Sequence, residues 1–369
     1  MISDRLFSIV RCADCRGVLD RHDGGSLVCR DCGRRYESHG DYLDVRPRRM
    51  FEEQTKYLDE ALHTDARHER VSPPLLGSRI RNDRLREFLA PARGELVVDL
   101  GCGSGRALLW NRDLGADMLG IDIAPFFSRD ARQQVDLMLG DLRTLPFADA
   151  TFDKAWSLDV LEHLSPDALA GMLAEAARVL KPGGSLFVYT HVRKNAPIAV
   201  GLKWINRLAR QLERWGLIDL RQERLRKSDH LNPLRDVAHL EQVVDAAGFR
   251  IGRIRFYTPI VGGFVENIMM RVAERAMARR ARVRSPSTGQ LPAANGEASR
   301  LPGPNEPTSG ELDRDAAAVR EARAAAKERI AHGGPTYIAL RALSFVMKLD
   351  LLLFGRITSG PFFALLVKK

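Results

Sequence analysis

The chain has 369 residues, a length that suits two or three domains. With 45% hydrophobic and 28% charged residues, its composition excludes a wholly disordered or fibrous protein. No apolar leader follows the first residues and no run of eighteen apolar residues occurs, so neither a secretory signal nor a membrane-spanning helix is expected. Five cysteines are too few for a disulfide scaffold. We therefore expect a protein of the reducing cytoplasm, and attachment to the inner membrane face stays open.

The net charge of +10 is concentrated in two segments. Residues 193–227 contain ten Lys and Arg against three acidic residues, and residues 271–284 contain six Arg against Glu274. Local basic segments favour phosphate, anionic lipid or an acidic partner, and solvated helix faces explain them equally well. Because the rest of the chain is close to neutral, nucleic acid is a less favoured partner.

Two C-x2-C pairs stand near the N-terminus, separated by thirteen residues. Four thiolates in two such pairs can complete a tetrahedral Zn²⁺ site, whereas four unconnected thiols would need an accidental double repeat. A module this small buries little core without metal, so folding and zinc binding should be coupled. The pattern predicts a structural zinc ribbon over residues 1–48. Its predicted ligands are Cys12, Cys15, Cys29 and Cys32.

An apolar segment at residues 95–100 runs directly into the turn Gly101-Cys102-Gly103-Ser104-Gly105, and a helix is expected over about 106–114. A strand that feeds a glycine-rich turn and a helix N-terminus brings backbone N–H groups close to a ligand. The spacing departs from a dinucleotide fingerprint and lacks the Lys-Ser/Thr pair of a phosphate loop. Cys102, inside the turn, is expected to be a small buried residue rather than a nucleophile.

Carboxylates follow the next predicted strands. Asp122 stands 23 residues after Asp99, where a carboxylate can accept hydrogen bonds from both hydroxyls of a ribose. Asp141 is placed to accept from the exocyclic amine of an adenine. Asp159 follows the fourth strand. Further strands are expected at 118–121, 135–139, 152–158 and 185–189, with a helix at 166–180.

These motifs resemble those of class I S-adenosylmethionine-dependent methyltransferases, closest to the type met in ubiquinone and menaquinone biosynthesis. The resemblance covers about 80–258 and rests on Val98-Asp99-Leu-Gly-Cys-Gly-Ser-Gly105, Gly140-Asp141-Leu-x3-Pro146-Phe147 and Leu180-Lys-Pro-Gly-Gly184. It implies an α/β, Rossmann-like fold with a seven-stranded, mostly parallel sheet and an antiparallel last strand. It also implies S-adenosyl-L-methionine as the cofactor, beside structural Zn²⁺ in the ribbon.

The same resemblance assigns roles to individual residues. Asp99 and the three glycines would face the methionine end of the cofactor, Asp122 would hold the ribose, and Asp141 would face the adenine edge. Asp159 would lie at the rim of the methyl-acceptor site. The predicted cofactor contacts are Asp99, Gly101, Gly103, Gly105, Asp122, Ile123, Asp141, Leu142 and Asp159.

The N-terminal segment 6–48 has a resemblance of its own. Its two cysteine pairs, followed by Gly33-Arg34-Arg35-Tyr36, are similar to the small zinc-ribbon family whose best-known members are activator subunits of tRNA and protein methyltransferases. In that family the ribbon is a structural or partner-binding module. The resemblance implies that the zinc stabilises the fold and performs no chemistry.

The remaining domain boundaries follow from composition and periodicity. We expect a linker with N-terminal helices over 49–94, and a methyltransferase core over 95–258 that contains a lid insertion at 193–235. The insertion carries a helical apolar stripe that suits a lid, a partner face or a helix lying on anionic lipid. That stripe comprises Leu202, Ile205, Leu208, Leu212 and Trp215.

A second insertion is expected over 259–360, before a final antiparallel strand at 361–369. Its Pro-, Gly- and Ser-rich middle, residues 285–310, is predicted to be disordered. A basic helix at 264–283 precedes that middle, and an Ala/Arg/Glu helix at 311–331 follows it. The apolar segment 336–354 predicts a helix packed on the domain or across a homodimer, with a membrane contact as the alternative.

Methyl transfer requires positioning of donor and acceptor, and it requires a base where the acceptor is a hydroxyl or amine. His163 and His191 follow the fourth and fifth strands and are the candidate bases. His230 of the lid insertion, where related enzymes often carry a lid histidine, is a further candidate, and a structural role is equally compatible with each. We expect a methyltransferase for a small-molecule or lipid-linked acceptor, on oxygen. The alternatives are RNA methylation, although Asp159-Val160-Leu161-Glu162 replaces an Asn-Pro-Pro-Tyr-type motif, and a non-catalytic scaffold docked through the ribbon.

Overall fold

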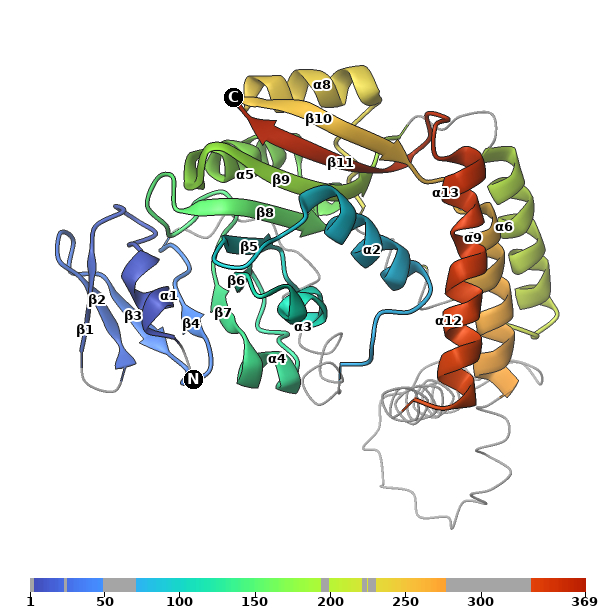
Figure 1. Cartoon of the computed structure of the whole chain (residues 1–369), viewed down its shortest axis with the longest axis horizontal. Coiled ribbons are helices and arrows are strands. Elements are labelled where there is room, and N and C mark those ends of the chain that lie inside the picture. Colours follow the sequence, from blue (N-terminus) through green and yellow to red (C-terminus); the bar gives the residue numbers. More distant parts are fainter. Residues whose placement is uncertain are drawn as a thin grey trace, which may run out of the picture.

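The computed structural model contains a mixed sheet with helices on both faces (Figure 1). Within the described residues, eleven strands pair in the order β1-β2-β3-β4-β7-β6-β5-β8-β9-β11-β10. The cysteine-rich segment forms one end of the sheet, and a group of helices stands on the opposite side of the molecule (Figure 1). The structure describes residues 3–22, 25–48, 71–193, 199–220, 224, 230–276 and 333–369.

Five parallel strands form the centre of the sheet. Every residue of β5 is buried, as expected for a strand covered on both faces. Because the five strands run in the same direction, their carboxyl ends meet at one edge, where the glycine turn and the predicted carboxylates lie. The five strands are β5 (Leu96–Leu100), β6 (Asp117–Asp122), β7 (Asp136–Leu139), β8 (Phe152–Leu158) and β9 (Leu180–His191).

The predicted antiparallel last strand is confirmed. Strand β11 (Pro361–Lys368) lies between β9 and β10 (Phe249–Phe256) and runs antiparallel to both. Its aromatic residue Phe363 pairs with Tyr189 of β9 and is fully buried. Strand β9 is longer than predicted, because its pairing with β8 continues across Pro182-Gly183-Gly184 through a register shift.

The N-terminal segment is part of this sheet, although the sequence predicted a separate small module. Its last strand β4 pairs in parallel with β7, and the Val45 N–H donates to the Leu139 carbonyl at 2.9 Å. Strand β7 would otherwise be an exposed edge, and β4 covers its free backbone groups. The segment comprises α1 (Asp4–Ile9), β1 (Leu19–Arg21), β2 (Leu27–Cys29), β3 (Arg35–Ser38) and β4 (Leu43–Asp44).

Helices cover both faces of the sheet. The apolar residues of α5 and α8 join one core cluster, and those of α2, α3 and α4 join the other. Helix α5 begins sharply, because Ser165 accepts a hydrogen bond from the Ala168 N–H and a proline occupies the first turn. These helices are α2 (Gly77–Leu89), α3 (Arg106–Asn111) with a 3-10 turn at Arg112–Leu114, α4 (Arg129–Gln134), α5 (Pro166–Val179) and α8 (Val237–Ala246).

Four further helices form what we call the helical layer: α6 (Ala199–Arg214), α9 (Ile260–Phe264), α12 (Pro335–Met347) and α13 (Leu349–Phe354). Helix α9 contacts each of the other three, and a π-helical turn, Val265–Met269, continues it. The predicted helix 336–354 is divided into α12 and α13 at Lys348. The predicted helix 311–331 and the predicted disordered middle 285–310 lie outside the described residues. The domain boundaries remain predictions.

Among the described residues, the structure contains no helix that is both long enough and apolar enough to cross a membrane.

Candidate active site and zinc centre

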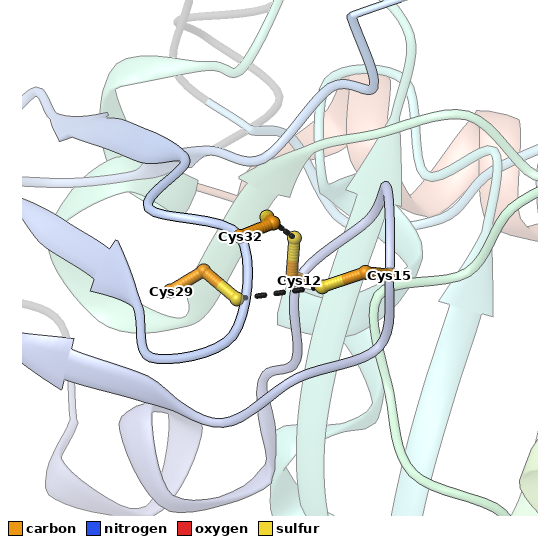
Figure 2. A group of neighbouring side chains, drawn as sticks. All are labelled: Cys12, Cys15, Cys29 and Cys32. Atoms are coloured by element: carbon orange, nitrogen blue, oxygen red, sulfur yellow. Dashed lines mark hydrogen bonds between the residues drawn. The ribbon is translucent and has the colours of Figure 1, made fainter.

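The four predicted zinc ligands converge at one end of the ribbon (Figure 2). The sulfur atoms of Cys12 and Cys32 lie 3.6 Å apart, and those of Cys15 and Cys29 lie 3.4 Å apart. Tetrahedral Zn²⁺ with Zn–S bonds of about 2.3 Å requires sulfur separations of roughly 3.8 Å. Only a small adjustment is therefore needed, and the four thiols fit a structural zinc ion.

Tyr36 supports this cluster, a role that the sequence did not reveal. Its buried hydroxyl accepts a hydrogen bond from the Ala13 N–H at 2.9 Å, which leaves its own proton for the Cys12 sulfur at 3.1 Å. Burial opposes ionisation of Cys12, but Tyr36 and neighbouring backbone N–H groups outweigh it and lower the pKa of the thiol to about 7. Cys12 is thus prepared to bind metal as a thiolate.

The glycine turn lies at the carboxyl end of β5, where the chain must turn tightly against its neighbours. Gly101, Gly103 and Gly105 all have positive φ, at +83°, +52° and +76°. A side chain at Gly101 would collide with Val160, whereas a Cβ at Gly103 would meet no atom within 4 Å. The turn is therefore packed on one side and open at Gly103, which leaves room for a ligand against the backbone.

Asp122 closes this turn from the end of β6. One carboxylate oxygen accepts from the Gly103 N–H at 2.7 Å, and the other accepts from the Ala124 N–H at 3.1 Å. A carboxylate has about four acceptor positions, so both oxygens keep a lone pair for ribose hydroxyls. Beneath the turn, Asp99 is buried; burial and the nearby Asp122 raise the pKa of Asp99 to about 8.

The structure gives Asp141 a different immediate partner from the predicted adenine. Its buried carboxylate receives hydrogen bonds from the Arg143 guanidinium at 2.8 and 2.9 Å and from the Arg143 backbone N–H at 2.9 Å. Ile123 and Leu142, which follow β6 and β7, are half-buried beside the same edge. An adenine amine would thus share the Asp141 carboxylate with Arg143.

The predicted acceptor rim is built around Asp159, which has an unusual left-handed backbone with φ of +56°. Its carboxylate lies 3.4 Å from the guanidinium of Arg81, a residue of α2. Arg81 also stands over the ring of Tyr189, 5.4 Å from its centre. Because Arg81 lies in α2, outside the recognised sequence motifs, its role could not be read from any of them.

The three candidate histidines come together although they are far apart in the chain. The ring centres of His163 and His230 lie 4.7 Å apart, and those of His191 and His230 lie 5.4 Å apart. The Asn232 N–H donates to the Glu162 carbonyl, which anchors the end of the predicted lid insertion against this cluster. Helix α6 from the same insertion packs on α9 instead.

Glu162 lies beside these histidines and was not among the predicted site residues. It is buried, accepts a hydrogen bond from the Thr190 hydroxyl at 2.8 Å, and has one carboxylate oxygen 3.9 Å from Nδ1 of His191. Burial, reinforced by the charge of Asp159, raises the pKa of Glu162 to about 8. Glu162 therefore binds a proton more readily near neutral pH than an ordinary glutamate does. Cys102 is buried, as predicted.

Comparison with known families agrees with this geometry. Residues 98–188 match the family described as "Methyltransferase domain", and residues 3–37 match the family described as "Trm112p-like protein". The chain thus contains one segment similar to methyltransferase domains and one segment similar to Trm112p-like proteins. The methyltransferase domain thus begins in β5 and ends in β9, and the Trm112p-like ribbon contains all four zinc ligands. The sites fit S-adenosyl-L-methionine and Zn²⁺, as the sequence predicted.

Individual relatives are named for chemically different acceptors. A sterol 4-C-methyltransferase of Caenorhabditis elegans is 34% identical over 27% of this chain and 31% of its own length. "Probable tRNA methyltransferase 9B" of Mus musculus is 37% identical over 29% of this chain and 24% of its own. A ubiquinone biosynthesis O-methyltransferase of Azorhizobium caulinodans is 29% identical over 50% and 72%. The chain thus spans only about a quarter to a third of the first two, and their names do not define its acceptor.

Proposed function

We propose that this protein is an S-adenosyl-L-methionine-dependent methyltransferase that methylates an oxygen atom of a small-molecule or lipid-linked acceptor. The observation that carries the proposal is the open backbone at Gly103 beside Asp122, whose carboxylate is fixed by two backbone N–H groups. Such an arrangement suits a nucleoside held against a glycine turn. The Azorhizobium ubiquinone relative, which covers the largest share of the chain among the three, is named as an O-methyltransferase.

In this proposal, different residues at the strand ends contact different parts of the cofactor. Gly101, Gly103 and Asp99 line the methionine end, Asp122 holds the ribose, and Asp141 with Leu142 lines the adenine. When bound, the cofactor supplies an electrophilic methyl group on a sulfonium. The protein's own task is to hold the acceptor in line with that group and to exclude water.

The acceptor hydroxyl must lose its proton as the new bond forms. His191 and His163 are the proposed bases, with His230 completing the cluster. Glu162 lies 3.9 Å from His191, and its carboxylate form, which its pKa of about 8 places above neutral pH, would stabilise an imidazolium there. A hydroxyl acceptor suits such a group, and this supports oxygen over an unactivated carbon.

The first test is calorimetric titration of the zinc-loaded protein with S-adenosyl-L-methionine and S-adenosyl-homocysteine. We expect Asp122→Ala to weaken both affinities about a hundredfold, because two hydrogen bonds to a charged group are lost. Asp113→Ala, which removes an exposed carboxylate paired with Arg86 away from the turn, serves as the matched control. An unaltered affinity in Asp122→Ala would refute the cofactor site.

The second test concerns the base. His191→Ala and His163→Ala should lower kcat by about a hundredfold or more while cofactor affinity stays unchanged. Methyl transfer would be followed by mass spectrometry with pools of hydroxylated metabolites and lipid extracts. Cofactor binding without any methylated product from either pool would contradict the proposed acceptor class.

RNA is a second candidate acceptor. The Trm112p-like ribbon and the mouse relative named as a tRNA methyltransferase favour it. RNA binding through phosphate contacts would weaken steeply as salt concentration rises. Methylation of tRNA in place of small molecules, together with such a salt dependence, would establish RNA as the acceptor.

A further inference from the structure

The helical layer carries nearly all of the exposed apolar side chains of the described structure. Of seventeen exposed large apolar residues, all but Val18 and Leu231 lie on the helical layer or on the short segments that directly continue its helices. Scattered apolar residues are normal on a protein surface, but a concentration on one element marks an interaction site.

Helices α12 and α13 present the most exposed of these residues. Ile338, Phe345 and Leu352 recur at intervals of seven, so they share one helical stripe, and the latter two side chains are 73% and 74% exposed. The opposite side is buried, since Met347 and Leu351 join the core. The outward stripe is therefore not a consequence of loose packing, because the same helices are well anchored on their inner side.

Charge on the same layer has one sign. On α6, Trp204 and Trp215 are 64% and 62% exposed at its surface and just beyond its end. Four exposed cations lie on the same helix: Lys203, Arg207, Arg210 and Arg214.

Within the described residues of the helical layer and the π-helical turn, no acidic side chain is exposed. Asp350 is buried and accepts hydrogen bonds from the Val261 and Gly262 N–H groups. Glu213 is paired with Arg224, Glu266 accepts from the Gly77 N–H, and Glu274 is paired with Arg271. The outward-facing charge of this layer is thus entirely positive.

We propose that the helical layer docks on an anionic lipid bilayer, with the apolar stripe of α12 and α13 entering the interface and the basic face of α6 meeting the headgroups. Exposed tryptophans and long cationic side chains are the residue types that such an interface accommodates. A second copy of the chain fits this surface less well. A two-fold interface would bring the same positively charged patch against itself, with no exposed acid to pair with it.

The docking face is connected to the proposed acceptor site. Leu76, directly before α2, donates its N–H to the Ser344 hydroxyl of α12 at 2.7 Å, and Lys348 is paired with Asp83 of α2. Helix α2 also carries Arg81, which contacts Asp159 at the acceptor rim. Docking would therefore bring the acceptor rim near the bilayer. The docking itself does not depend on the proposed function, and only the suggestion that a lipid-linked substrate reaches this rim rests on it.

Vesicle flotation of the full, zinc-loaded chain tests the proposal. Vesicles of phosphatidylcholine alone are compared with vesicles that contain equal amounts of phosphatidylcholine and phosphatidylglycerol. We expect binding to the anionic vesicles only, weakened at least about tenfold by the double variant Phe345→Gln, Leu352→Gln. The matched control is Val18→Gln, which removes an exposed apolar residue from the ribbon and should change nothing.

The charge contribution is tested separately with Arg207→Glu, Arg210→Glu, for which Arg35→Glu, Arg250→Glu is the matched control on exposed strand positions. We expect the α6 variant to lose binding and the control variant to retain it. Equal binding to both vesicle types, no binding at all, or an unaffected α12–α13 variant would overturn the proposal. So would light scattering that shows a dimer which Phe345→Gln, Leu352→Gln dissociates. Calorimetry with S-adenosyl-L-methionine in the absence of vesicles keeps this outcome distinct from failure of the proposed function.

Discussion

The Trm112p-like ribbon and the helical layer are attached to the same methyltransferase domain in opposite ways. Leu6, Val10, Leu43 and Val45 of the ribbon segment belong to the same core cluster as Val98 of β5. The ribbon therefore buries its apolar side chains against the rest of the sheet, and Val18 is the one large apolar residue that its described part exposes.

The helical layer keeps a small core of its own, formed by Ala209, Ile218, Leu220 and Ile268, and leaves most of its outer apolar residues exposed. A segment that completes a sheet has no remaining surface to offer, whereas a layer anchored on one side alone presents the other side to a partner. The ribbon is thus an internal support for the cofactor half, and the helical layer is the interaction surface.

Removal of zinc should give the largest of the expected effects, because it removes the metal that folds the ribbon. Chelation, or Cys12→Ser, should lower the free energy of unfolding by at least about 3 kcal/mol, because binding energy of a structural zinc is folding energy. Loss of the ribbon should also expose the β7 edge and weaken cofactor binding. Thermal unfolding and calorimetry measure the two effects, with Val18→Gln, an exposed position of the ribbon outside the cysteine cluster, as the control. If chelation changes neither quantity, the ribbon is not a support of the cofactor half.

Glu175 offers a test of the contact between ribbon and domain. Its buried carboxylate accepts from Arg16 of the ribbon at 3.1 Å, from Arg178 at 2.7 Å and from the Leu145 N–H at 2.8 Å. Glu175→Ala should lower the free energy of unfolding by about 3 kcal/mol, since the largely buried Arg178 guanidinium loses one of its acceptors and the Leu145 amide loses its acceptor. Arg16→Ala should cost less than about 1 kcal/mol, because that side chain is more than half exposed. Equal costs in denaturant unfolding would contradict this account.

Asp99, at the centre of the sheet, gives a prediction for the pH dependence of stability that does not involve the ribbon or the helical layer. Folding raises its pKa to about 8, so between about pH 4 and pH 8 the folded protein holds a proton that the unfolded chain has released. Stability without cofactor should therefore fall as pH rises, by roughly 2 kcal/mol between pH 6 and pH 8. Glu162, whose pKa is also raised to about 8, adds a similar contribution over the same pH range. Asp99→Asn should therefore reduce the slope by about half in denaturant titrations, and a slope that the variant leaves unchanged would assign it to groups other than Asp99.

The smallest expected effect is also informative. Phe345→Gln and Leu352→Gln should change the free energy of unfolding by less than about 0.5 kcal/mol, because both side chains are exposed. Leu351→Ala, next to Leu352 but buried, should cost about 2 to 4 kcal/mol. Thermal unfolding compares the three variants. A large decrease in the free energy of unfolding from Phe345→Gln would mean that the stripe is packed within the protein. That result would remove the contrast with the ribbon.

Much of the fold was predictable from the sequence because its signals are local. The cysteine pairs, the glycine turn after β5 and the carboxylates Asp99 and Asp122 are recognised by spacing within a few residues of a strand end. Alternation and apolar runs also predicted the central strands and the last antiparallel strand. The predicted roles of His163 and His191 remain untested, although the structure brings both into one cluster.

Tertiary structure alone decided which distant segments meet. No residue pattern indicated that β4 would extend the sheet at β7, that Arg143 would bind Asp141, or that Arg81 would reach Asp159. Edge pairing and side-chain contacts between distant segments depend on how the complete core packs, and a spacing rule does not contain that information. The sequence determined the chemistry that each strand end carries. The packing decided which of those strand ends meet Glu162 and His230 of the insertion to form one site. It also decided which helices face outward.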